Sequence, residues 1–324
     1  MKRTIDTLLL LALPASGKSE VRRYLALLSP ERCREDFHLG ETVQLDDFPY
    51  VHIMRRISEE LRGRGQDDGV FFQSSELPFQ DARDWGTLIE LLNEDYADLL
   101  ARRRPAPPSA AAWLCDRFDA ARRKAGAPAK LGALPAPVRK ELLAAIEPDC
   151  AKLLRDKNAG IVDDLTGRTV VIEFARGGPD KSPLPLPAPY GYRHSLSLLS
   201  PEILERAGIL YIWVTPEESR RKNRARANPD DPGSILHHGV PDAVMYGDYG
   251  CDDVAWLLEH SDRPDTVRIE AHGRAWHLPL GRFDNRVDKT TFIREDRERW
   301  APADVAAVHA GLREAFDHLL RASG

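Results

Sequence analysis

The feature that most constrains the fold is a short apolar segment that leads into a glycine-containing loop. Residues 7–13 read TLLLLAL, and residues 14–20 read PASGKSE. A continuous aliphatic run of this length is typical of a strand that is covered on both faces of a parallel sheet. Pro14 ends the run, and Gly17 permits backbone conformations that other residues resist. The residues that follow have apolar side chains at helical spacing, so we predict a strand, a loop and a helix in that order.

A secretion signal is the alternative interpretation of the same segment. Lys2 and Arg3 supply a basic start, and residues 14–16 imitate a small-residue cleavage site. Asp6, however, leaves an apolar core shorter than signal peptides use. This interpretation also gives residues 17–19 no role. We therefore favour the strand, and we expect a cytoplasmic protein, since no apolar run approaches the roughly 20 residues that span a bilayer.

Residues 12–19, ALPASGKS, fit the phosphate-binding pattern G-x-x-x-x-G-K-[ST] except at Ala12, where the first glycine is usual. In such a loop, successive backbone N–H groups and the N-terminus of the following helix surround the phosphates. Lys18 would reach the β- and γ-phosphates, and the Ser19 hydroxyl would bind Mg²⁺. ATP and Mg²⁺ are therefore the expected cofactors. The predicted nucleotide-binding residues are Pro14, Ala15, Ser16, Gly17, Lys18, Ser19 and Glu20.

The rest of the chain alternates between strand-like and helix-like segments. Apart from the first strand, the strand candidates are residues 42–45, 167–173 and 209–214, with one or two more in 265–283. Helical patterns cover residues 84–100 and 111–126, and two helical pieces fall within 136–160. This order favours an α/β fold of three layers, with a mostly parallel sheet and helices on both faces. We expect residues 1–70 and 161–324 to form this core, and residues 71–160 to be a helical insertion.

Acidic residues follow two of the predicted strands. Asp46 and Asp47 come at the end of the second strand, and Glu173 ends the third. Ligands bind beyond the carboxyl ends of parallel strands, so these carboxylates suit a catalytic base and a magnesium site. Asp46 is the preferred base, and Ser19, Glu173 and Asp46 are the candidate metal ligands. The structural alternatives are a turn or helix cap at the aspartates, and an ion pair of Glu173 with Arg176.

A group of arginines follows the fourth predicted strand. Thr215 and Glu218 have the spacing of a helix capping box, and the sequence SRRKNRAR comes next. Arginines that close on the phosphates would stabilise the charge on a transferring phosphoryl group. The alternative is an exposed basic helix face. On the first interpretation, the catalytic residues are Lys18 and the two aspartates together with Arg220, Arg221 and Arg224.

Charge and composition narrow the classes of function and partner that remain. The net charge of −5 argues against a broad basic surface for nucleic acid, so such a partner is not favoured. The four cysteines lack the spacing of a zinc site and are expected to be reduced thiols. Phe71, Phe72, Phe79 and Trp85 are expected to form part of the core of the insertion rather than a surface on which bases stack. The polar residues 281–292 suit either a connecting loop or a contact with a nucleotide.

Three segments together resemble the P-loop kinases of the nucleoside and nucleotide type, including the adenylate-kinase-like and polynucleotide-kinase-like small kinases. LPASGKSE resembles their phosphate loop, QLDD the acidic end of their second strand, and VTPEESRRKNRAR their strand leading to an arginine-bearing lid. The resemblance covers about a third of the chain, and only the phosphate loop is specific. It implies a P-loop NTPase fold with a five-stranded parallel core and an ATP- and Mg²⁺-dependent phosphotransferase activity. Residues 71–160, the predicted insertion, have no counterpart in this resemblance.

The preferred hypothesis is thus a kinase that transfers phosphate from ATP to a small-molecule or nucleotide-like acceptor, without a membrane partner. One alternative is a nucleotide-hydrolysing switch that binds a protein through residues 71–160. The other is a non-catalytic nucleotide-binding scaffold. A 5′-polynucleotide kinase is a variant of the preferred hypothesis, and the acidic net charge disfavours it.

Overall fold

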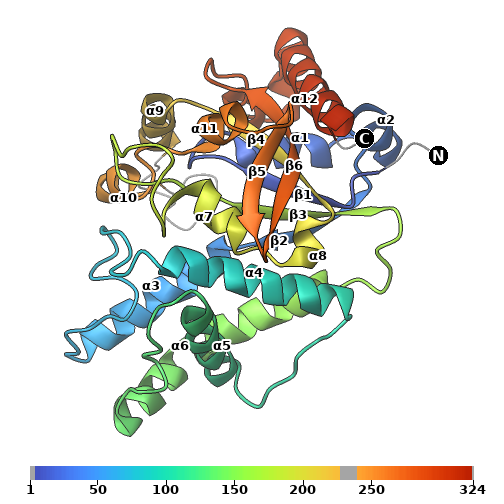
Figure 1. Ribbon diagram of the computed structural model, residues 1–324. Coiled ribbons are helices and arrows are strands. Elements are labelled where there is room, and N and C mark those ends of the chain that lie inside the picture. Colours follow the sequence, from blue (N-terminus) through green and yellow to red (C-terminus); the bar gives the residue numbers. More distant parts are fainter. Residues whose placement is uncertain (1–3, 227–238, 323–324) are drawn as a thin grey trace.

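A six-stranded mixed sheet forms the centre of the protein, for which a computed structural model describes residues 4–226 and 239–322 (Figure 1). The strand order is β2 (Glu41–Asp46), β3 (Arg168–Phe174), β1 (Thr7–Leu11), β4 (Ala207–Trp213), β6 (Arg274–Asp284) and β5 (Thr266–Ala271). The first five strands in this order are mutually parallel, and β5 pairs antiparallel with β6. The predicted α/β class with a mostly parallel sheet is confirmed.

Strand β1 lies between β3 and β4, and all five of its residues are buried. Alternate side chains of a strand point to opposite faces, so an all-aliphatic strand must be covered on both. Leu8 and Leu10 pack in one apolar cluster, whereas Leu9 and Leu11 pack in another. The uninterrupted apolar run in the sequence is therefore explained by its central place in the sheet.

Helices cover both faces of the sheet, as predicted. The cluster around Leu8 and Leu10 receives side chains from α1 (Lys18–Ala26), α2 (Pro30–Phe37) and the long α12 (Pro302–Ala322). The opposite cluster receives side chains from α4 (Asp84–Leu100), α7 (Gly191–Ser197), α8 (Pro201–Leu204) and α11 (Val254–Glu259). In Figure 1 the two sets of helices lie on either side of the strands.

A helical unit packs beside the sheet and consists of α3 (Phe48–Gly63), α4, α5 (Ala110–Lys124) and α6 (Ala136–Gly160) (Figure 1). Their apolar side chains share one cluster, so helix α3 joins the unit that the sequence places in residues 71–160. The prediction of two helical pieces within 136–160 is wrong, because α6 is continuous through Pro148. Leu142, Ile146, Cys150 and Leu154 form one buried face on both sides of that proline, which holds the two halves in line.

The C-terminal third of the chain completes the sheet and the site. Residues 265–283 contain two strands, which form an antiparallel hairpin. Helix α9 (Pro216–Arg226) begins with the predicted cap, since the Glu218 N–H donates to Thr215 Oγ1 at 3.2 Å. Helix α10 (Asp242–Gly247) follows, and the short 3-10 helices η1 (Thr291–Arg294) and η2 (Arg297–Arg299) precede α12.

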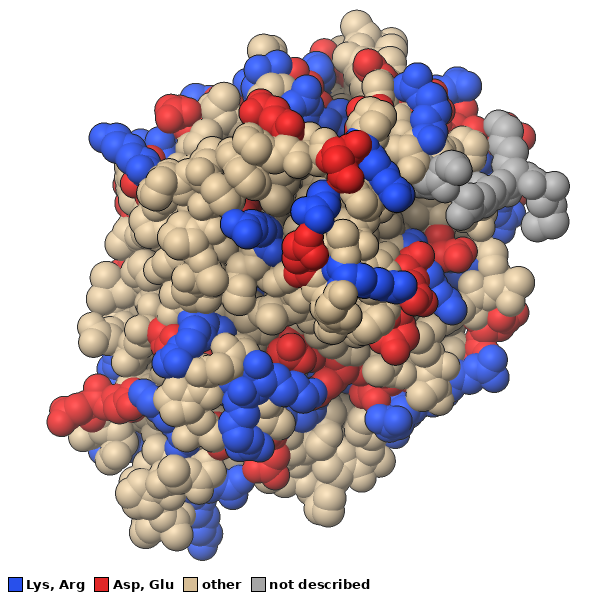
Figure 2. Space-filling model, in the orientation of Figure 1, with Lys and Arg blue, Asp and Glu red and all other residues tan. Residues whose placement is uncertain are grey.

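Two general expectations can be compared with the structure. All four cysteines are free thiols, as expected. Within residues 4–226 and 239–322, every helix is either too short or too polar to cross a bilayer. Figure 2 shows acidic and basic side chains intermingled over the face in view, rather than gathered by sign.

Candidate functional site

The loop between β1 and α1 has the geometry of a compact turn around backbone amides. Gly17 precedes α1 with φ 108°, a left-handed conformation that favours glycine. A Cβ at this position would lie 2.6 Å from Thr290 Oγ1. Asn285 Nδ2 donates to the Ser16 carbonyl at 2.7 Å. The polar segment after β6 therefore packs against the loop and supports it. A contact between this segment and a nucleotide stays a prediction.

A cavity of about 260 Å³ opens in front of this loop. Its wall includes all seven predicted nucleotide-binding residues, 14–20, and the acidic residues Asp46, Asp47 and Glu173. The acidic groups meet because β2 and β3 are parallel neighbours, in which Asp46 is the register partner of Glu173. Glu173 is in turn the register partner of Leu10 in β1. The convergence predicted from the strand ends is thus a property of the sheet.

The chemical character of the loop suits an anion. Helix α1 has nine residues, and its N-terminal N–H groups carry a partial positive charge. Ser16 is 1% exposed, and its hydroxyl has no hydrogen-bond partner among the described residues. Lys18 Nζ lies 3.4 Å from the Ala12 carbonyl oxygen. Glu20 differs from the others, because its carboxylate is paired with Arg294 at 2.6 Å, which leaves its backbone as the group that can serve a ligand.

Arg22 joins the two carboxylates of the strand ends, a role that we did not predict. Its Nη1 lies 2.8 Å from Glu173 Oε2 and 3.7 Å from Asp46 Oδ2. The alternative pairing of Glu173 with Arg176 is therefore wrong. Lys18 and Arg22 are four residues apart on α1 and so share one helix face. That spacing was the signal in the sequence that could have identified Arg22 as part of the site.

The electrostatics distinguish Asp46 from the other acidic residues. Burial, followed by the nearby charges of Glu173 and Asp47, raises the pKa of Asp46 to about 7. A carboxylate with a pKa near neutrality is well matched to accept a proton at physiological pH. The Asp46 side chain nevertheless keeps 31% of its surface exposed, so solvent reduces the energetic weight of this shift.

Oxygen ligands for a magnesium ion are present at the cavity wall in Ser19, Asp46 and Glu173. Arg22 occupies one face of Glu173, so a cation would share that carboxylate with a guanidinium. Over the described ranges, no three acidic, histidine or cysteine side chains form a cluster suited to a metal. The three residues fit an ion that also relies on water and phosphate oxygens, as Mg²⁺ commonly does.

Substituting Asp46 with asparagine should change how stability depends on pH. The folded protein keeps the Asp46 proton up to about pH 7, whereas an unfolded aspartate releases it near pH 4. Stability contributed by this group therefore falls as the pH rises from about 4 to 7. We expect Asp46→Asn to increase the unfolding free energy by about 1 to 2 kcal/mol at about pH 8 and to have little effect near pH 4.

Urea unfolding of both proteins without Mg²⁺ measures this difference. Asp67→Asn is a suitable control, because Asp67 is exposed and does not line the cavity. An equal effect of Asp46→Asn at both pH values would show that Asp46 does not titrate in this range.

Asp47 is held in a different way, by a buried ion pair. Arg176 Nη1 lies 2.7 Å from Asp47 Oδ2, and Arg176 Nη2 donates to the Trp85 carbonyl at 3.2 Å. Arg176 is 1% exposed, and its guanidinium lies 4.9 Å from the centre of the Trp85 ring. Burial raises the pKa of Asp47, and the guanidinium opposes that shift. Asp47 is therefore fixed in position, which leaves Asp46 as the aspartate free to exchange a proton.

Part of the cavity wall is aromatic. The Phe72 and Phe79 rings stack with centres 4.4 Å apart, and Phe79 meets the Trp85 ring edge-on at 4.8 Å. Tyr249 extends the row, at 5.4 Å from Trp85. These rings belong to the apolar cluster of the helical unit, as predicted, together with Phe71. Phe72, Phe79 and Trp85 also line the cavity, which the sequence-based expectation missed.

Two charged residues interrupt the aromatic wall. Asp248 is 3% exposed; its Oδ2 makes no hydrogen bond of ordinary geometry within the described residues, but the Trp85 side chain and the Phe79 N–H lie close enough to lower its pKa, against the larger effect of burial. Burial raises the pKa of Asp248 to about 6. The Arg55 guanidinium lies 4.2 Å from the centre of the Phe72 ring, and burial lowers its pKa. The cavity therefore has one end suited to phosphate and another suited to a flat organic group with a polar substituent.

The structure does not bring the three arginines of α9 to the cavity wall. Arg221 and Arg224 are exposed and pair with Glu218 and Asp242, respectively. Arg220 is 8% exposed and lies 3.6 Å from Asp180, with its guanidinium 4.6 Å from the Tyr246 ring. The helix does contact the loop between β1 and α1, because Ser219 Oγ donates to the Pro14 carbonyl at 2.7 Å. A catalytic role for these arginines stays a prediction that requires α9 to move.

Comparison of the chain with protein-family models, curated proteins and solved structures finds no match.

Proposed function

We propose that the protein is a Mg²⁺- and ATP-dependent kinase with a P-loop NTPase fold. The observation that carries the proposal is the cavity whose wall combines residues 14–20 with Asp46, Asp47 and Glu173. A phosphate loop at the end of a central parallel strand and a carboxylate at the end of a nearby strand are the parts that phosphoryl transfer needs. The sheet supports the fold assignment, since its five parallel strands are flanked by helices on both faces.

Several polar residues of the cavity have separate tasks in this reaction. The loop amides and Lys18 bind and orient the phosphates, and Asp46 accepts the proton of the acceptor hydroxyl. The acceptor oxygen forms a bond to the γ-phosphorus, the bond from that phosphorus to the bridging oxygen breaks, and ADP leaves. Mg²⁺ would be held by Ser19 and Glu173, with Asp46 reaching it through water, and it would neutralise phosphate charge. Arg22 and Lys18 share that work from the protein side.

The acceptor occupies the aromatic end of the cavity in this proposal. Phe72, Phe79 and Trp85 offer ring surface for a flat or apolar body. Asp248 offers a buried carboxylate oxygen to a hydrogen-bond donor. An acceptor that satisfies both groups also brings a hydroxyl toward Asp46, because all of these residues line one cavity.

Asp248→Asn should therefore separate acceptor binding from nucleotide binding. We expect the KM for the acceptor to rise by about tenfold, since a hydrogen bond to a charged group contributes about 1.5–3 kcal/mol. The KM for ATP should stay within about twofold of the wild-type value, because Asp248 lies on the aromatic side of the cavity. Steady-state kinetics with each substrate varied in turn provides the measurement. Equal increases in both KM values would contradict the division of the cavity into two ends.

The decisive experiment measures ATP consumption with Mg²⁺ in the presence and absence of acceptors. The panel contains nucleosides, nucleoside monophosphates, sugars, aminoglycoside antibiotics and 5′-hydroxyl oligonucleotides. A rate that rises with one class, together with transfer of labelled γ-phosphate to that compound, supports the kinase. A slow rate that no acceptor changes points instead to a nucleotide-hydrolysing switch, and binding of ATP without turnover points to a scaffold. The intermingled charges in Figure 2 make an oligonucleotide the least favoured of these acceptors.

A further inference from the structure

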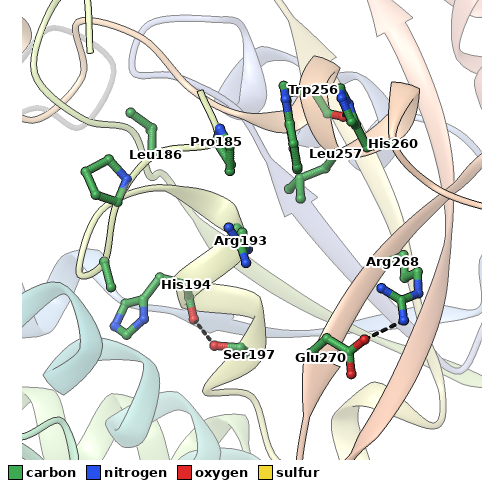
Figure 3. Close-up of a pocket in the computed structure, with 12 residues that line it drawn as sticks. Pro185, Leu186, Arg193, His194, Ser197, Trp256, Leu257, His260, Arg268 and Glu270 are labelled. Carbon is green, nitrogen blue, oxygen red and sulfur yellow. Dashed lines mark hydrogen bonds and ion pairs between the residues drawn. The ribbon is translucent and has the colours of Figure 1, made fainter. Parts of the chain in front are cut away.

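A second cavity lies apart from the proposed kinase site (Figure 3). Its volume is about 450 Å³, which is within the range of cavities that hold small organic ligands. The cavity is bounded by α7, α11, strand β5 and the proline-rich residues 185–188. Within the described part of the chain, it shares no lining residue with the cavity in front of the phosphate loop. It is therefore a separate candidate binding site.

The charges around this cavity leave one cation without an acidic partner. Arg268 and Glu270 form an ion pair along one face of β5, drawn as a dashed line in Figure 3. Arg268 also lies 3.7 Å from Asp262. Arg193, by contrast, has no side-chain hydrogen bond or ion pair among the residues described, and Figure 3 shows it on α7 at the cavity. One unpaired guanidinium suits a ligand with a single negative charge.

The backbone holds Arg193 firmly although its side chain has no acidic partner. The N–H groups of Tyr192 and Arg193 donate to the two carboxylate oxygens of Asp253, at 2.7 and 3.1 Å. Asp253 is fully buried, so this contact is shielded from water. Gly191 fits closely beside it, since a Cβ there would lie 2.7 Å from Asp253 Oδ2. The backbone of Arg193 is therefore fixed, and only its exposed side chain has to be ordered when an anion binds.

The opposite side of the cavity is apolar and aromatic. Trp256 stacks on His260 with ring centres 3.9 Å apart and planes at 14°. His260 is itself fixed by a contact of 2.8 Å between its Nδ1 and the Trp256 carbonyl oxygen. Figure 3 shows the Trp256 ring beside Leu257 and facing the region of Pro185. A flat hydrocarbon or aromatic body can pack against these surfaces.

We propose that this cavity binds a small organic monocarboxylate. Its carboxylate pairs with the Arg193 guanidinium, and its apolar or aromatic body packs against Trp256 and Pro185. Arginine matches a carboxylate with two parallel hydrogen bonds, which gives the pair direction as well as charge. A neutral ligand would leave the guanidinium unpaired, and a dianion would have only one free cation to meet.

Calorimetric titration of the full chain with 2-naphthoate tests the proposal. The controls among ligands are 2-naphthamide, which has the same shape without the charge, and acetate, which has the charge without the body. We expect 2-naphthoate to bind with a dissociation constant of about 1 mM or tighter, and each control to bind at least about tenfold more weakly. Saturating Mg·ATP and the Lys18→Ala substitution should leave this binding unchanged, because the two cavities share no lining residue.

Two variants assign the binding to the cavity. Arg193→Gln should weaken 2-naphthoate by about tenfold or more, whereas the matched control Arg263→Gln, at an exposed position outside the cavity, should not change it. Trp256→Ala should weaken both naphthyl compounds. The proposal is overturned if Arg193→Gln binds 2-naphthoate as tightly as the wild type does, or if the amide binds as tightly as the acid. It is also overturned if binding does not saturate at 2-naphthoate concentrations about tenfold above the expected dissociation constant.

Discussion

Replacing Lys18 with alanine is expected to reduce ATP turnover at least about a hundredfold while leaving the fold intact. The Lys18 ammonium lies at the start of α1, within the wall of the proposed nucleotide site. It supplies charge where negative charge accumulates on the phosphates in the transition state. The loss should therefore appear in kcat as well as in kcat/KM. Phosphate release or a coupled ADP assay gives the rates, and circular dichroism and thermal unfolding monitor the fold.

Lys140→Ala is the matched control for this experiment, because Lys140 is exposed on α6, outside the cavity. It removes the same side chain and the same charge, and it should retain wild-type turnover. Unchanged activity in Lys18→Ala would sink the kinase proposal together with the nucleotide-hydrolysing alternative. A loss of activity accompanied by unfolding would be resolved by Lys18→Met, which keeps most of the apolar stem and removes the charge.

Replacing Arg176 with methionine should cause the largest loss of stability among the substitutions considered. The Arg176 and Asp47 side chains are 2% and 10% exposed, and they lie 2.7 Å apart. Removing one partner of a buried ion pair leaves an uncompensated charge, which costs about 3–5 kcal/mol. Guanidinium chloride unfolding near neutral pH measures the loss. Arg221→Met, at an exposed arginine, should change stability by less than about 0.5 kcal/mol.

The double substitution Arg176→Met with Asp47→Leu separates the ion pair from other contacts of Arg176. Removing both charges should recover part of the loss, because no buried charge then remains without a partner. The deficit of Arg176→Met should also shrink as the pH falls toward about 4, because Asp47 can then be neutralised in the folded state. A double variant that is no more stable than Arg176→Met would assign the effect to the packing of Arg176 on Trp85 and Phe174.

The two ion pairs of the cavity explain why adjacent aspartates have different properties. Asp47 lies against Arg176 in a buried environment, whereas Asp46 shares Arg22 with Glu173 and remains partly exposed. In our proposal, the Asp47 carboxylate is a structural element that joins the sheet to the aromatic wall, and the Asp46 carboxylate is the base. Two adjacent aspartates thus have different roles in the proposal: Asp47 is held rigidly, and Asp46 exchanges a proton.

Much of the architecture followed from local sequence patterns. The aliphatic run of residues 8–11 predicted a central strand, and the glycine, lysine and serine after it predicted a loop and a helix. The acidic residues at two strand ends predicted a common site, because parallel strands end at one edge of the sheet. Each of these conclusions depends on residues that are neighbours in the chain, or on the general geometry of a parallel sheet. The structure confirms the strands and the placement of these residues around one cavity.

The partners of the charged groups were decided only by the tertiary structure. Arg176 faces Asp47 rather than Glu173, and Arg22 takes the place beside Glu173, although 129 and 151 residues separate the members of these pairs. No local pattern encodes such distances, because they depend on how strands and helices pack. The continuity of α6 through Pro148 has the same origin, since burial on both sides of the proline outweighs its local cost.

The sequence by itself determined the class of the sheet, the strand, loop and helix of residues 7–26 and the carboxylates at the strand ends, since short-range periodicity and backbone preferences specify these features. The aromatic wall, the pairing of Asp47 with Arg176 and the cavity around Arg193 and Trp256 were decided by the tertiary structure alone. These last features combine side chains from remote parts of the chain, whose contact is a result of packing the whole core rather than of any one segment.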